Sequence, residues 1–251
     1  MSTGYRAALL FGLASLTAGT VPAMAEERIF SFDSHIAVNF DMSLDVTETI
    51  LINVEGTNIK RGIVKDLPAP PRSGSGRSAG LGVKILGVTR DGVNEPFRLE
   101  PGPAATQLRI GKADALLAAK PTTYVIHYRV TRPAGSLNKF NELQWDVTGN
   151  SWALPIDAAF VTVDLPKGSQ VTQGSAAVRQ SDGKSRDLQI GNSDGGQFTA
   201  RTTAALPPGA HFTVLVEWPK GLMADAAAGS VQFPAVQWGG KRKRLEALRL
   251  R

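Results

Sequence analysis

Apolar and polar residues alternate along much of this chain, and that period of two constrains its fold more than any other feature. The alternation runs through residues 30–40 and resumes through residues 44–54. Successive side chains of a β-strand point to opposite faces, so the pattern predicts strands with one buried face. A short polar bend around Asp41 and Ser43 predicts that the two runs pair as an antiparallel hairpin.

Further short strands are predicted at regular spacing. Residues 83–90 and 93–99 flank Asp91-Gly92, a dipeptide that tolerates the positive φ angles of a tight hairpin turn. Only residues 112–120 resemble a helix. The remaining predicted strands cover residues 122–130, 160–165, 188–190, 198–201 and 212–218. The pattern predicts an all-β chain folded as an antiparallel, immunoglobulin-like β-sandwich. Two packed sandwich subdomains meeting near residue 150 are the alternative.

The first 25 residues have the features of a secretory signal peptide. Arg6 precedes an apolar run over residues 7–16, and Ala23-Met24-Ala25 supplies the small residues that signal peptidase reads. We therefore expect cleavage after Ala25. The run is too short to span a bilayer, which needs roughly 20 apolar residues. The mature protein is expected to be exported, with a periplasmic or other extracytoplasmic location.

The charge of the chain is concentrated at its C-terminal end. Residues 241–251 hold six basic residues and one acidic residue, whereas residues 26–240 carry no net charge. A neutral body offers no electrostatic surface for nucleic acid. The segment 221–251 is therefore interpreted as a linker and a basic tail. Its leucines suggest peripheral contact with anionic lipid as a role for the tail.

Several patterns that could indicate catalysis or metal binding are short and lack supporting context. The chain has no cysteine, and His35, His127 and His211 are scattered singly. We therefore predict no metal site and no cofactor. Gly76-Arg77-Ser78-Ala79-Gly80 fits the G-x-S-x-G pattern of serine hydrolases, but it lies in a loop rich in Pro, Gly and Ser without the strand before it and the helix after it that the motif needs.

Glu48 is unusual because the period of two places it among the apolar residues of its strand. A buried carboxylate must be paired, protonated or turned outward. The sequence suggests a structural ion pair with Arg61 or Arg129, with a bulge or edge position that wets the carboxylate as the alternative.

Trp145 and Trp152 bracket a short polar stretch, Asp146 to Asn150. Two such rings could form a platform for a sugar, whereas a tryptophan in the core of the sandwich is the simpler reading. They are the candidate ligand-binding residues of the chain.

Several short motifs resemble one protein family. These are Glu27-Arg28-Ile29, residues 44–50, Arg61-Gly62-Ile63, residues 88–92 and residues 141–150. Together and in this order they resemble the N-terminal region of the YciQ-like predicted bacterial membrane proteins, a domain of unknown function numbered 2207. The resemblance covers residues 26–165 and thins toward 220. It implies an extracytoplasmic β domain followed by transmembrane helices. This chain departs from the family where the first such helix is expected, because basic residues stand there, and it is expected to be either a truncated membrane protein or a soluble variant.

These observations predict a non-enzymatic extracytoplasmic β-sandwich over residues 26–220, serving envelope binding or scaffolding. Its expected partners are envelope proteins or polysaccharides. A secreted glycan-binding domain is the first alternative, and a serine hydrolase at Ser78 is the second.

Overall fold

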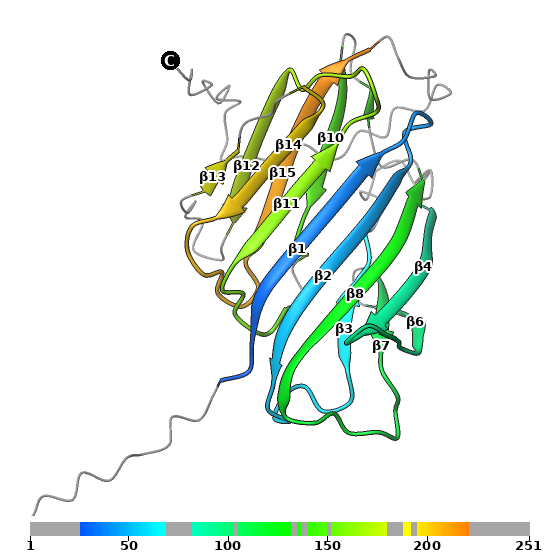
Figure 1. The fold of residues 1–251 in the computed structure, drawn as a ribbon, viewed down its shortest axis with the longest axis vertical. Coiled ribbons are helices and arrows are strands. Elements are labelled where there is room, and N and C mark those ends of the chain that lie inside the picture. The colour runs from blue at the N-terminus through cyan, green and yellow to red at the C-terminus, as the bar shows by residue number, and fades with distance from the viewer. Residues whose placement is uncertain are drawn as a thin grey trace, which may run out of the picture.

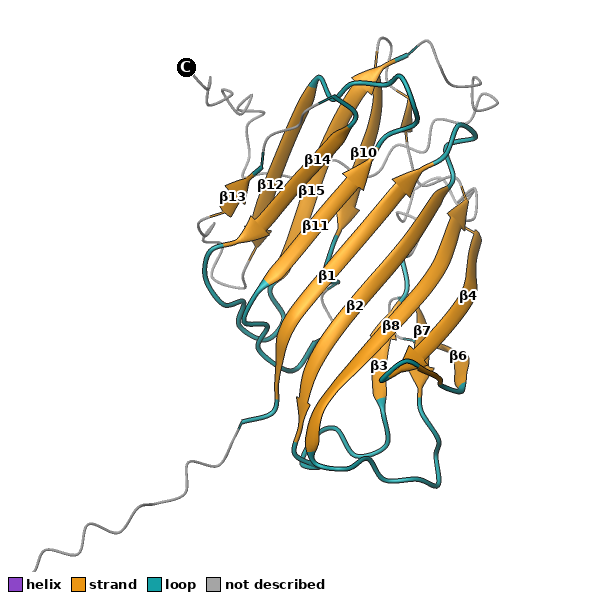
Figure 2. Ribbon diagram, viewed as in Figure 1, coloured by secondary structure: helices purple, strands orange, loops and turns teal. Residues whose placement is uncertain are grey.

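A computed structural model describes residues 26–68, 82–102, 105–131, 135–136, 140–149, 152–179, 188–191 and 195–220. The predicted signal peptide, the loop that contains Ser78 and the basic tail lie outside the described residues. The described chain is all-β and contains no helix (Figure 2). The helical interpretation of residues 112–120 is therefore wrong. These residues form a loop without regular structure, and the strand β8 begins at Lys120.

The strands follow one another closely along the chain, as the turn signals predicted. Their bounds are β1 Arg28–Val38, β2 Leu44–Val54, β3 Ile63–Asp66, β4 Gly82–Arg90, β5 Val93–Asn94, β6 Phe97–Pro101, β7 Thr106–Ile110, β8 Lys120–Thr131, β9 Gly135–Ser136, β10 Phe140–Asp146, β11 Ala159–Asp164, β12 Gln173–Arg179, β13 Leu188–Ile190, β14 Gln197–Thr202 and β15 His211–Pro219.

The predicted β1–β2 hairpin is confirmed, whereas the second is confirmed only around its turn, because the predicted strand 93–99 divides into β5 and β6, and β6 pairs with β7 in another sheet. β1 and β2 pair antiparallel over almost their whole length, with one bulge between Ile29 and Ser31. β4 and β5 pair antiparallel across the turn at Asp91 and Gly92, whose φ angles are 51° and 80°. Positive φ at both central residues is what a turn of type I′ requires, and glycine accepts it without steric cost.

A single sheet of eight strands forms one layer of the molecule. Its order is β13-β14-β11-β1-β2-β8-β4-β5. β1 and β11 pair in parallel, so the sheet is mixed and the expectation of a fully antiparallel sheet is corrected. Strands from both sides of residue 150 share this sheet (Figure 1). The immunoglobulin-like strand order is not confirmed.

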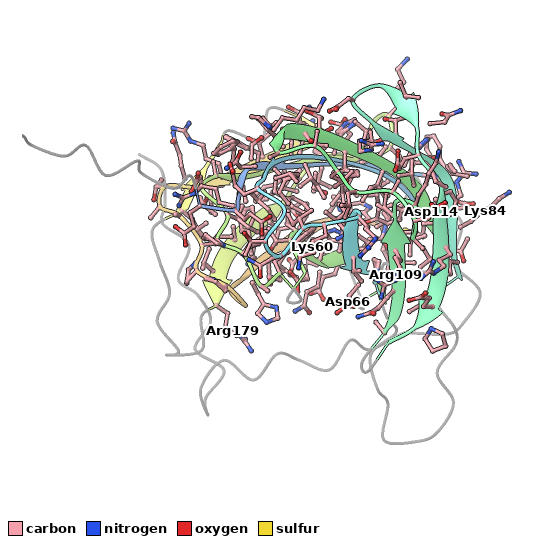
Figure 3. The ribbon with its side chains drawn as sticks, turned by 90° about the horizontal axis from the view of Figure 1, so that it is seen from below. Lys60, Asp66, Lys84, Arg109, Asp114 and Arg179 are labelled. Atoms are coloured by element: carbon pink, nitrogen blue, oxygen red, sulfur yellow. The ribbon has the colours of Figure 1, made fainter. Side chains whose placement is uncertain are left out.

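Two smaller sheets cover one face of the large sheet. One has the order β12-β15-β10-β9 and the other β3-β7-β6. Figure 3 shows both on the same side of the large sheet. The alternating residues of β1, β2 and β8 that face them are buried, including Phe32, Ile50 and Ile126 at 0% exposure. The hydrophobic core therefore lies between the layers, and the other face of the large sheet is polar.

The strand directions define two ends of the molecule. We call the end where β1 begins the N-terminal pole; it also carries the loops 55–62 and 111–119 (Figure 1). The opposite end, where β15 ends, is the C-terminal pole. It carries the β1–β2 turn over residues 39–43 and the β11–β12 turn over residues 165–172 (Figure 1).

Candidate functional site

Glu48 occupies the inner face of the large sheet, as the period of two predicted. It lies on β2 opposite Ser34 of β1 and Ile126 of β8, in regular register on both sides. Its exposure is 1%. No bulge turns the side chain outward, because the register shift of the β1–β2 pair lies far away, at Ile29 and Ser31. The carboxylate therefore needs partners inside the core.

Two side chains supply those partners. The Tyr128 hydroxyl donates a hydrogen bond of 2.7 Å to Oε1 of Glu48. The Lys65 Nζ atom lies 3.2 Å from the same oxygen, and the Lys65 side chain is 4% exposed. Lys65 comes from β3, so the ion pair crosses from the large sheet to the three-stranded sheet. Lys65 Nζ also lies 5.4 Å from the centroid of the Phe32 ring, within the range of a cation–π contact.

The cation beside Glu48 is therefore Lys65, and neither Arg61 nor Arg129 takes that place. Arg129 alternates to the outer face of β8, where it makes two hydrogen bonds of 2.7 Å to Asp45. Arg61 lies in the exposed loop before β3. A sequence signal for Lys65 existed, because the period of two places it between Ile63 and Leu67 on the buried face of its strand.

Two polar atoms of this cluster have no hydrogen-bond partner within the described part of the chain. They are Oε2 of Glu48 and Oγ of Ser34, which belong to register partners on adjacent strands. The pKa of Tyr128 is raised well above its ordinary value of 10.0, first by burial and then by the charge and hydrogen bond of Glu48. The Tyr128 hydroxyl thus stays protonated and keeps donating to the carboxylate. Enclosed in this way, the cluster can fix the packing of the two sheets.

Both candidate ligand-binding tryptophans are buried. Trp145 is 5% exposed and Trp152 is 7% exposed. The Trp152 Nε1 atom donates a hydrogen bond of 2.8 Å to the carbonyl of Thr148, and its ring meets the Phe32 ring edge-on at 6.2 Å. A sugar platform needs ring faces that are open to solvent. The structure places both rings in the core, which is the simpler of the two readings that the sequence allowed.

Each histidine lies on a different strand. His35 contacts Asp164 at 2.6 Å, and His211 contacts Asp146 at 2.9 Å. His127 lies exposed on β8. Among the described residues no three His, Cys, Asp or Glu side chains gather closely enough to hold a metal ion.

Glu27 anchors the start of β1 and was not singled out by the sequence patterns as a buried residue. Its carboxylate accepts hydrogen bonds from the backbone N–H groups of a single loop, those of Glu55, Thr57, Asn58 and Ile59. Burial would raise the pKa of Glu27, but these four donors outweigh it and lower the pKa below 4.5. The adjacent Arg28 pairs with Asp157 at 2.9 Å. Only the Glu27-Arg28-Ile29 motif of the family resemblance marked this segment.

Residues 28–217 match the family described as "Predicted membrane protein (DUF2207) N-terminal domain". This chain belongs to that family. A curated relative, the uncharacterized protein YciQ of Escherichia coli strain K12, is 28% identical over 205 residues. The match covers 81% of this chain and 32% of that relative, so the chain spans about a third of the relative's length.

Several solved structures are similar to part of this chain. A native yeast LTA4 hydrolase has a TM-score of 0.49 at 12% identity, covering 76% of this chain and 29% of the hydrolase chain. A variant of an M1 zinc metallopeptidase from Deinococcus radiodurans has a TM-score of 0.41 at 13% identity, covering 75% of this chain and 42% of the peptidase chain.

Within the described residues of this DUF2207 domain, no helix has the length and apolar character to cross a membrane.

Proposed function

We propose that this chain is a non-enzymatic extracytoplasmic β-sandwich module of a membrane-associated protein, serving envelope binding or scaffolding. The observation that carries the proposal is the enclosure of Glu48, Lys65 and Tyr128. These side chains have the chemistry of an acid–base centre, but they are packed between two sheets and bonded to one another. Membership of a family of predicted membrane proteins supports the membrane association.

Two measurements test this function. Edman sequencing of the protein recovered from a bacterial periplasmic extract is expected to begin at Glu26, because cleavage is expected after Ala25. The purified protein is then expected to co-sediment with isolated cell-envelope fragments. A cytoplasmic location with an intact N-terminus would contradict export, and a protein that stays in the supernatant would contradict envelope binding.

The glycan-binding alternative is weakened by the burial of Trp145 and Trp152, at 5% and 7% exposure. Tryptophan fluorescence during titration with cell-wall polysaccharides separates it from the first function, because no spectral shift is expected without a sugar platform. The hydrolase alternative concerns Ser78, which lies outside the described residues. It predicts covalent labelling by a serine-reactive probe.

A further inference from the structure

The C-terminal pole carries two exposed apolar side chains. Phe40 in the β1–β2 turn is 53% exposed, and Phe140 at the start of β10 is 38% exposed. Phe140 is the register partner of Pro219, the last residue of β15. This places Phe140 beside the point where the chain leaves the last strand, at the top of Figure 1.

The turn that presents Phe40 is held by its own hydrogen bonds. The backbone N–H of Asn39 donates to the carbonyl of Ser43 at 2.8 Å, and the Asn39 side-chain amide donates to Ser43 and Asp45. In the same turn Met42 adopts a φ of 65° and is only 2% exposed. The turn therefore buries one large apolar side chain and directs the other, Phe40, into solvent.

We propose that the C-terminal pole rests against the lipid surface of a membrane, with Phe40 entering the interfacial layer. The proposal extends the proposed function, since it assumes that the domain works beside a membrane. The matched family is the N-terminal domain of a predicted membrane protein, so the membrane part of such a protein follows from this pole. Aromatic side chains favour the membrane–water interface, and the exposed Lys167 and Lys220 at the same pole suit an anionic headgroup layer.

The opposite pole provides the competing surface and a matched control. Val93 in the β4–β5 hairpin is 69% exposed, and Leu116 is 71% exposed. Exposure of apolar side chains alone would therefore favour the N-terminal pole. The exit of β15 at the other end favours that pole, because the rest of a membrane protein that begins with this domain would continue from there.

The natural absence of cysteine makes a labelling experiment direct. Two variants of residues 26–251 are prepared, Phe40→Cys and Val93→Cys, and each is labelled at its introduced cysteine with an environment-sensitive fluorophore. Each is attached through a C-terminal His tag to phosphatidylcholine vesicles that contain chelating lipid, with and without phosphatidylglycerol. The label at position 40 is expected to shift to shorter wavelength and to be quenched by brominated lipid, whereas the label at position 93 stays solvent-like. Equal responses at both positions, or a response at position 93 alone, would overturn the proposal.

A second pair of variants carries the label away from Phe40 and differs only in whether Phe40 is present. A label at Lys167→Cys reports on the approach of the same pole, and adding Phe40→Ser is expected to reduce its quenching by brominated lipid at least twofold. Unchanged quenching would show that Phe40 takes no part. Because the tag fixes the protein to the vesicle, this result is independent of export. Failure of the proposed function would appear in the N-terminal sequencing and the envelope sedimentation instead.

Discussion

The carboxylate of Glu48 and the ammonium group of Lys65 meet at 3.2 Å across the boundary between two sheets, each almost fully enclosed. The two residues are separated along the chain by the end of β2 and the loop 55–62. Removing one partner of such a pair leaves the other charge buried and uncompensated, which lowers the free energy of unfolding. This loss is larger than the net stability that the intact pair contributes in comparison with apolar side chains.

Removing one partner of this pair is expected to be severe. Lys65→Met should lower the free energy of unfolding by about 3–5 kcal/mol, measured by urea denaturation, because Glu48 then lacks its cation. Lys84→Met, on the exposed face of β4, is the control and should change stability by less than about 0.5 kcal/mol. The double variant Glu48→Gln with Lys65→Met should cost less than the sum of the single changes. Full stability of Glu48→Gln would contradict a structural role for the pair.

Two buried tyrosines on β8 form a matched test of the hydrogen bond to Glu48. Tyr128→Phe removes the donor at 2.7 Å and should destabilise the protein by about 1–3 kcal/mol. The Tyr124 hydroxyl has no hydrogen-bond partner among the described residues, and burial raises its pKa to about 12. Tyr124→Phe should therefore be neutral or stabilising in the same denaturation experiment. Equal losses for both variants would assign the effect to packing.

The pH dependence of stability should report on Glu27. Its pKa is lowered in the folded protein, so the stabilisation is fully present above 4.5 and is lost as the pH falls through the lowered value. Glu27→Gln should cost about 2 kcal/mol at neutral pH and have a smaller effect at pH 2–3. Glu26→Gln, at an exposed neighbour, is the control. The melting temperature as a function of pH is the measurement, and an effect of constant size would contradict this origin.

Glu142 should affect the pH dependence of stability in the opposite direction to Glu27. Burial raises its pKa above 4.5, and the charge of Glu217, its register partner on β15, raises it further. Ionised Glu142 therefore destabilises the fold above the raised pKa, and the penalty disappears as the pH falls to about 4. Glu142→Gln should raise the melting temperature at pH 7 by a few degrees and leave it unchanged at acidic pH. A lower melting temperature at pH 7 would show that the carboxylate has a stabilising partner.

Local patterning predicted the strands of the large sheet but missed β3, β7, β9, β10 and β12 of the two smaller sheets, and the candidate site shows the consequence, because β3 carries Lys65. The period of two placed Glu48 on a buried face and paired β1 with β2, because both are properties of neighbouring residues. It did not find Lys65 and predicted Arg61 or Arg129 as the partner of Glu48 instead. The alternation of β8 directs Arg129 to the opposite face, and the loop before β3 leaves Arg61 in solvent.

The sequence by itself determined the all-β character, the β1–β2 hairpin, the turn at Asp91-Gly92, the family and the burial of Glu48, because each depends on local alternation, turn residues or motif order. Only the tertiary structure decided that β1 pairs in parallel with β11, that Glu27 is held by the loop 55–59, and that Lys65 meets Glu48. Each of these contacts joins segments far apart in the chain. Their partners are chosen by how the sheets stack, and no local period encodes that choice.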